Sequence, residues 1–273
     1  MKTFFPVLVT LPHCSGEVPP EIWESMQASG YSEASIRRRL ISGGDPFTDL
    51  LYALPTLASI PAQFSRFVVD LNRHRDEVGP NGVIKTTDFE LQPFYAPGYQ
   101  IDSAERERRL RLYYDPFQAE VDSILALGQV RFLMDGHSMS ARGPLLGPDA
   151  GQARPALCLG NFGDAAGNPL RASYVSLEPS LAIAIKKFAE TLIGQAFPLW
   201  DENNRVQLNH PFDAGFILEH YTRPTSKHRV PGLLFEVNRA LYLDEERLEP
   251  IAGSLEKWKV VLGELLEFIC QKL

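Results

Sequence analysis

The sequence predicts a single α/β domain over residues 1–273, with one mostly parallel mixed sheet that is flanked by helices on both faces. Two observations support this fold class. Apolar segments of strand length alternate with amphipathic segments of helical length, and no break in composition, low-complexity tract or internal repeat divides the chain. A chain of 273 residues can also bury a large core.

The chain is expected to begin with a buried strand over residues 4–11, because the run FFPVLVTL is almost wholly apolar. A loop that contains glycine and proline then leads to two short helices, at residues 20–29 and 31–41. Pro20 suits the first turn of the former helix, and Ser32 suits the cap of the latter.

A further helix start is predicted within residues 43–57, where two glycines precede Asp45 and Pro46. Aspartate is favoured at the N-cap and proline at the first helical position. Asp45 and Asp49 would then lie four residues apart on the same side of the helix. Residues 63–73, QFSRFVVDLNR, are predicted as the second main strand.

Residues 79–100 contain the turn signal PNG and several aromatic side chains, which predicts a loop at the rim of a pocket. Residues 102–128 have a long amphipathic pattern, either one helix or two that join near Asp115 and Pro116. Residues 130–138 return to a strand.

The segment 140–155 is rich in glycine and proline and is expected to be the most flexible part of the chain. The run ALCLG that follows predicts a short strand before a glycine-rich turn. The other expected elements are helices at residues 176–194, 211–221 and 251–272 and a strand at residues 232–238.

The charge pattern argues against a nucleic-acid partner. The formal net charge is −7, and the arginines occur in short mixed groups instead of one basic patch. A small anionic substrate would therefore need locally placed arginines, because the overall field would repel it. Neither composition nor charge decides between a monomer and a homodimer.

Three cysteines, Cys14, Cys158 and Cys270, give an odd number without a CxxC pair. This count favours neither a disulfide framework nor a thiolate zinc site, and it fits a reducing cytoplasm. The first apolar run is too short to span a membrane, and it contains Pro6, so we expect no membrane association.

Two histidines stand at the ends of predicted strands, His13 after VTLP and His137 in LMDGHS. A single histidine at such a place is more often a surface or capping residue than a ligand. Two of them with acids nearby favour one divalent metal ion, zinc in the first place, because open zinc sites use three His, Asp or Glu ligands. We favour Asp45 as the third ligand, with Asp49 or Glu17 as alternatives.

Glu236 lies in the middle of the apolar strand LLFEVNR, where an unpaired carboxylate is costly. In the functional interpretation it takes a proton from the attacking water and passes it to the leaving amine. In the alternative interpretation it pairs with Arg239 or faces solvent on an edge strand. The pairs Asn72-Arg73 and Asn238-Arg239 suit a carboxylate on the substrate, with Arg73 as the first choice.

Seven motifs together resemble the N-formylglutamate amidohydrolase family in order and spacing, from about residue 6 to residue 246. They are VTLPHCSGEVP, DPFTDLLY, RFVVDLNR, YYDPF, LMDGHSM, LCLG and GFILEHYTRPTSKHRVPGLLFEVNRALYLDE. The resemblance implies a zinc carboxypeptidase-like (phosphorylase/hydrolase-like) fold and the hydrolysis of N-formyl-L-glutamate to formate and L-glutamate.

Carried onto this chain, the resemblance implies His13, His137 and an aspartate of DPFTD as metal ligands, Asn72 and Arg73 as carboxylate binders, and Glu236 as the acid/base. The chain departs from the family pattern in two places. It has His-Cys-Ser-Gly at residues 13–16 where His-Ser-Gly is usual, and its turn after LCLG reads NFGDAAG without the expected Ser-Cys.

Three alternatives stay open at this point. The substrate could be another N-acyl amino acid or a peptide, or the chain could bind a metal or small molecule without turnover. A serine hydrolase would use Ser138 in GHSMS, but a nucleophile elbow requires glycine where Ser140 stands. His220 or Arg223 in LEHYTRP would stabilise the oxyanion beside the metal, with Arg239 as a further substrate contact.

Overall fold

The computed structural model describes residues 4–170 and 174–273 of the chain. Its main feature is a six-stranded sheet with the strand order β2-β1-β3-β6-β4-β5. The strands are β1 (Phe5–Leu11), β2 (Thr56–Pro61), β3 (Phe132–Met139), β4 (Leu157–Gly160), β5 (Val206–Leu208) and β6 (Gly232–Asn238). A small hairpin joins β7 (Leu243–Asp244) to β8 (Glu249–Pro250).

The first four strands of this order are parallel, and β4 runs antiparallel to β6. The predicted mostly parallel mixed sheet is therefore confirmed. The helices are α1 (Pro20–Gln27), α2 (Glu33–Ser42), α3 (Thr48–Leu51), α4 (Ser103–Arg109), α5 (Asp115–Leu125), α6 (Pro179–Ala196), α7 (Phe216–Thr222) and α8 (Ser254–Lys272).

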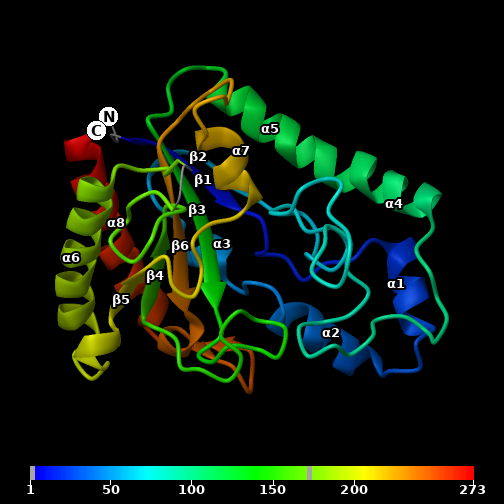
Figure 1. Ribbon diagram of the computed structural model, residues 1–273. Helices are drawn as coiled ribbons and strands as arrows, with labels where there is room; N and C mark the ends of the chain where they lie inside the picture. The colour runs from blue at the N-terminus through cyan, green and yellow to red at the C-terminus, as the bar shows by residue number, and fades with distance from the viewer. Residues whose placement is uncertain (1–3, 171–173) are drawn as a thin grey trace.

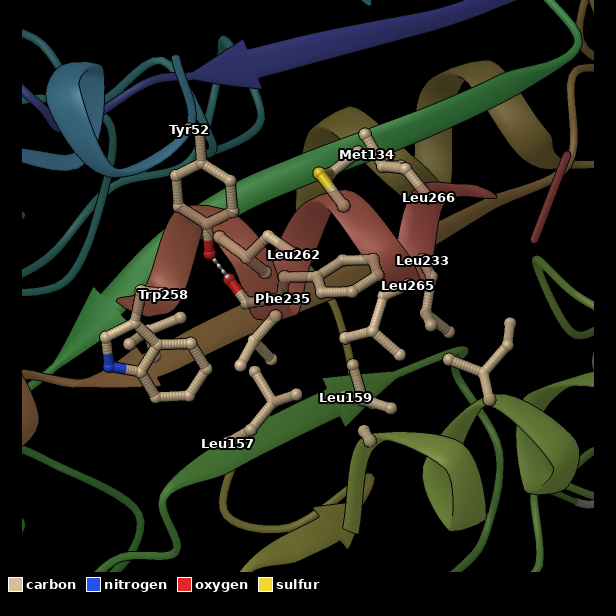
Figure 2. Close-up of a cluster of buried hydrophobic side chains, with 14 of the residues drawn as sticks. Tyr52, Met134, Leu157, Leu159, Leu233, Phe235, Trp258, Leu262, Leu265 and Leu266 are labelled. Atoms are coloured by element: carbon tan, nitrogen blue, oxygen red, sulfur yellow. Dashed lines mark hydrogen bonds between the residues drawn. The ribbon is translucent and has the colours of Figure 1, made fainter. Parts of the chain in front are cut away.

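Helices cover both faces of the sheet, as predicted: α6 and α8 on one side, α5 and α7 on the other (Figure 1). Alternation along β1 explains the two layers, because successive strand side chains point to opposite faces. Val7 and Val9 pack in the α6/α8 cluster, whereas Leu8 packs in the α5/α7 cluster. Figure 2 shows the former cluster, where Trp258 and Leu262 of α8 meet the sheet.

The predicted strand over residues 63–73 is wrong. These residues form turns, and the strand beside β1 is β2, which precedes them. Their apolar side chains are nevertheless buried, since Phe67 and Val68 pack in a cluster with α1 and α2, and Val69 and Leu71 pack under α5 and α7. A short apolar run shows burial, but it cannot distinguish a strand from a buried loop.

The predicted N-cap at Asp45 is also wrong. Helix α3 has only four residues and begins at Thr48, after Phe47 in a left-handed conformation with φ 63°. Asp45 instead lies in the loop before the helix, where its N–H donates to the His13 carbonyl over 2.8 Å. This bond joins the loop to the end of β1, and Asp45 is buried whereas Asp49 is exposed.

The long amphipathic segment divides near Asp115, as one of the two interpretations expected. Helix α4 and helix α5 are joined by a π-helical turn at Leu110–Tyr114, and Pro116 lies in the first turn of α5. No helix within the described ranges 4–170 and 174–273 has the length and apolar character that crossing a membrane would need.

Candidate metal centre and substrate cavity

The site is built at the carboxyl ends of the neighbouring strands β1, β3 and β6. His137 and Glu236 are register partners on β3 and β6, so their side chains project from the same face of the sheet. His13 follows β1 by two residues, next to β3. Parallel neighbours thus bring together three residues that are far apart in the sequence, on the face covered by α5 and α7.

His13, Asp45 and His137 form a buried group whose potential ligand atoms lie within 4.8 Å of one another. The Asp45 Oδ2 atom is 3.0 Å from His137 Nδ1 and 3.5 Å from His13 Nδ1. The His13 Nδ1 atom is buried without a hydrogen-bond partner among the described residues. The alternatives Asp49 and Glu17 are both exposed and lie outside this group.

Each histidine also contacts a second carboxylate through its Nε2 atom, the ring nitrogen that does not face Asp45. The His13 Nε2 atom lies 2.8 Å from Asp70 Oδ1, and the His137 Nε2 atom lies 3.1 Å from Asp135 Oδ2. Such carboxylate partners fix the tautomer and the ring orientation of metal-binding histidines. Here they leave both Nδ1 atoms turned toward Asp45.

The two outer carboxylates are compensated differently. Asp70 accepts from Arg66 and from the buried Lys85 ammonium, and these cations, against its burial, hold the pKa of Asp70 well below its usual range. In addition to the histidine, the donors to Asp135 among the described residues are neutral: Thr10 over 2.8 Å and an asparagine amide over 3.0 Å.

Asn72 is the asparagine that contacts Asp135. Its Nδ2 atom donates to Asp135 and lies 3.1 Å from His137 Nε2, while its Oδ1 atom accepts from the Ile217 N–H over 2.8 Å. The amide therefore links the first turn of α7 to the support of His137. Asn72 lines the cavity, as the predicted role of a substrate ligand requires, but its side chain is buried and already hydrogen-bonded to protein groups.

A cavity of about 480 Å³ opens beside the two histidines, and Glu236 lines it. Within residues 4–170 and 174–273, the Glu236 carboxylate makes no hydrogen bond or ion pair. Burial is the main reason that its pKa is raised to about 7; the Asp45 charge raises it further, and His137 opposes the shift. The carboxyl group can thus exchange a proton near neutral pH.

Two of the predicted substrate arginines, Arg73 and Arg239, line this cavity. Arg239 donates to the carbonyls of Ser42 and Gly44 and lies 3.2 Å from Glu245. The alternative in which Arg239 pairs with Glu236 is therefore wrong.

His220 and Arg223 do not line the cavity. His220 is exposed on α7, and Arg223 is bound to Glu219 one turn away. The sequence interpretation that placed both beside the metal is corrected by the course of α7, whose first turn points to the site while its last turn leads away.

Several residues of the site were missed by sequence reasoning, namely Arg66, Asp70, Lys85, Asp135 and Arg154. A signal existed for the two aspartates. Each interrupts an apolar run, VVDLN and FLMDG, as Glu236 does in LLFEV. The cost of a buried carboxylate, which singled out Glu236, applies to them equally.

Comparison with known proteins places the chain in a family. The model of the N-formylglutamate amidohydrolase family matches residues 5–243. The chain belongs to this family. Among curated relatives, the N-formylglutamate deformylase of Pseudomonas aeruginosa is 25% identical over 96% of this chain and 91% of its own length. The N-formylglutamate deformylase of Pseudomonas putida is 27% identical over 76% of this chain and 73% of its own length.

Two solved structures share the fold of this chain. The N-formylglutamate amidohydrolase of Ralstonia eutropha JMP134 matches with a TM-score of 0.70 at 19% identity, over 99% of this chain and 96% of its own. A gene product of Agrobacterium tumefaciens, Atu2144, matches with a TM-score of 0.63 at 19% identity, over 98% and 91%. The resemblance expected from the motifs is thus confirmed for the family and for the fold.

Proposed function

We propose that this N-formylglutamate amidohydrolase family member is a metal-dependent amide hydrolase that cleaves the N-acyl bond of an acidic amino acid, with N-formyl-L-glutamate as the substrate. One observation carries the proposal: the His13, Asp45 and His137 group lies on the same cavity as an unpaired carboxyl group, Glu236. The names of the Pseudomonas relatives support the choice of substrate.

The residues present fit a divalent ion. The donor set of two imidazoles and one carboxylate matches an open zinc site, and the unpaired, buried His13 Nδ1 atom faces Asp45. Burial opposes the charged form of His137, but the nearby Asp135, Asp45 and Glu236 carboxylates raise its pKa well above the ordinary value, so the surroundings of this group favour a positive charge.

A divalent ion held by this group would lower the pKa of a water molecule to about 7 and polarise the acyl carbonyl. Glu236 is the acid/base: its raised pKa lets it accept the proton of the attacking water and deliver it to the leaving nitrogen. Arg66 lines the cavity, and its Nη1 atom has no protein acceptor within the described residues. We therefore assign the stabilisation of the oxyanion to Arg66 instead of His220 or Arg223.

The serine-hydrolase alternative finds no support in the geometry. Ser138 and His137 are adjacent in β3 and therefore point to opposite faces of the sheet. The Ser138 Oγ atom has no hydrogen-bond partner among residues 4–170 and 174–273. Histidine activation of a serine requires a direct hydrogen bond between the two side chains or one that forms with substrate.

The test combines metal analysis with a substrate panel. Purified protein is assayed with N-formyl-L-glutamate, N-formyl-L-aspartate and N-acetyl-L-glutamate, with and without a chelator, beside the Glu236→Gln variant. We expect formate release from N-formyl-L-glutamate that chelation abolishes, and a variant that retains its metal but loses turnover. Full activity after complete metal removal, or no hydrolysis of any of the three, would refute the proposal.

A further inference from the structure

Six arginine side chains line the cavity, and one of them, Arg142, has no acidic partner among the described residues. The other five each have a carboxylate oxygen at 2.6 to 3.8 Å. These five are Arg39, Arg66, Arg73, Arg154 and Arg239. Arg142 has no acidic partner within residues 4–170 and 174–273, and its guanidinium donates only to the Gly151 carbonyl over 3.0 Å.

The hydrogen bond to Gly151 uses the Nη1 atom of Arg142. The Nε and Nη2 atoms, which lie on the same edge of the guanidinium, have no acceptor in the described part of the protein. A carboxylate binds arginine by two parallel N–H···O bonds along one edge of the guanidinium group. The free edge of Arg142 therefore has the shape and charge to receive a carboxylate.

The backbone around Arg142 is built tightly, although the sequence suggested the most flexible segment of the chain. The Gly143 N–H donates to the Gln152 carbonyl over 3.0 Å, and the Arg154 N–H donates to the Ala141 carbonyl over 3.0 Å. A Cβ atom at Gly143 would lie 2.2 Å from the Asp149 carbonyl oxygen, so only glycine permits this approach. The loop that carries Arg142 is thus fixed at the cavity.

The same loop also contacts the segment around Phe89, which lines the cavity too. The Leu146 N–H donates to the Phe89 carbonyl over 2.9 Å, and the buried Arg154–Asp149 pair, with two contacts of 2.7 Å, holds the loop from within. Arg154 is therefore committed to the loop itself. Arg154 is paired with Asp149 before any substrate enters, whereas Arg142 is an exposed side chain with no acidic partner among the described residues.

We propose that Arg142 is the receptor for the side-chain carboxylate of the substrate and so selects acidic over neutral N-acyl amino acids. This inference rests on the proposed function, because it assigns the second negative charge of N-formyl-L-glutamate. In this assignment the α-carboxylate of the substrate is bound by Arg73, which lines the cavity beside Asn72. The side-chain carboxylate of glutamate would supply the counter-charge that Arg142, unlike the other five cavity arginines, lacks within residues 4–170 and 174–273.

The experiment compares Arg142→Gln with the matched control Arg111→Gln, in holoprotein. Arg111 is exposed outside the cavity and makes no hydrogen bond or ion pair within the described residues. Two ratios are measured: kcat/KM for N-formyl-L-glutamate over N-formyl-L-glutamine, and calorimetric affinity for L-glutamate over L-glutamine. We expect Arg142→Gln to lower both ratios about 10-fold, and the control to change them by less than about two-fold.

The outcomes separate this inference from the proposed function. If the wild type hydrolyses N-formyl-L-glutamate and Arg142→Gln keeps both ratios, the inference is overturned and the proposed function stands. If the wild type hydrolyses neither substrate but binds L-glutamate more tightly than L-glutamine, and Arg142→Gln loses this preference, the subsite stands and the proposed function falls. Equal losses in Arg142→Gln and Arg111→Gln would also overturn the inference, because net charge would then explain them.

Discussion

Replacing Asn72 by alanine is expected to weaken metal binding and to destabilise the protein. The change removes the donor to Asp135 and the acceptor for the Ile217 N–H. Each buried group left without a partner costs about 1–3 kcal/mol, so the free energy of unfolding should fall by about 2–6 kcal/mol. Asn72 supports Asp135, the carboxylate that holds the metal-ligand candidate His137, so its loss should lower metal affinity about 10- to 100-fold.

The measurements are chelator competition for metal affinity and chemical unfolding for stability, with KM determined on the same preparations. Asn81→Ala is the matched control. Asn81 also lines the cavity, but its buried side-chain oxygen has no hydrogen-bond partner in the described ranges. The control should therefore retain its metal affinity and its stability.

The opposite pattern would contradict the role inferred for Asn72 from the structure. If Asn72→Ala kept its metal affinity and its stability while KM rose 10-fold or more, on the order of one lost charged hydrogen bond, then the amide would bind substrate. The role that the sequence suggested would then be correct, and the contacts to Asp135 and Ile217 would be incidental.

Three further outcomes are expected. In metal-free protein the pKa of Glu236 is raised to about 7, so its contribution to the free energy of unfolding is present below pH 4.5 and is lost as the pH rises through 7. The Glu236→Gln variant should therefore be more stable than wild type by roughly 2–3 kcal/mol at pH 8 and equally stable near pH 4, as measured by thermal unfolding with chelator. Equal stability of the two proteins at pH 8 would contradict this. Asp45→Asn should lose bound metal by elemental analysis while exposed Asp49→Asn keeps it, and the reverse would exchange the two assignments. His220→Gln and Arg223→Gln should change kcat/KM by less than about two-fold, whereas a loss above 10-fold in either would return that residue to the site.

The sequence by itself predicted three of the residues that the structure brings together at one cavity. His13, His137 and Glu236 could be singled out because a ligating or charged group at the end of a buried strand is costly without a partner. Alternation of helix and strand made β1, β3 and β6 parallel, and parallel strands end at one edge of the sheet. Both of these are local properties of the chain, so they can be read without coordinates.

Tertiary structure alone decided which partner each polar group meets. The run QFSRFVVDLNR is as apolar as a strand, but its burial comes from packing against distant helices, and its Asn72 amide is occupied by Asp135 and Ile217. Likewise, only the folded loop shows that Arg142 lacks a carboxylate partner within residues 4–170 and 174–273 while the other cavity arginines have one. Such pairings join residues tens to hundreds of positions apart, and a local pattern carries no information about them.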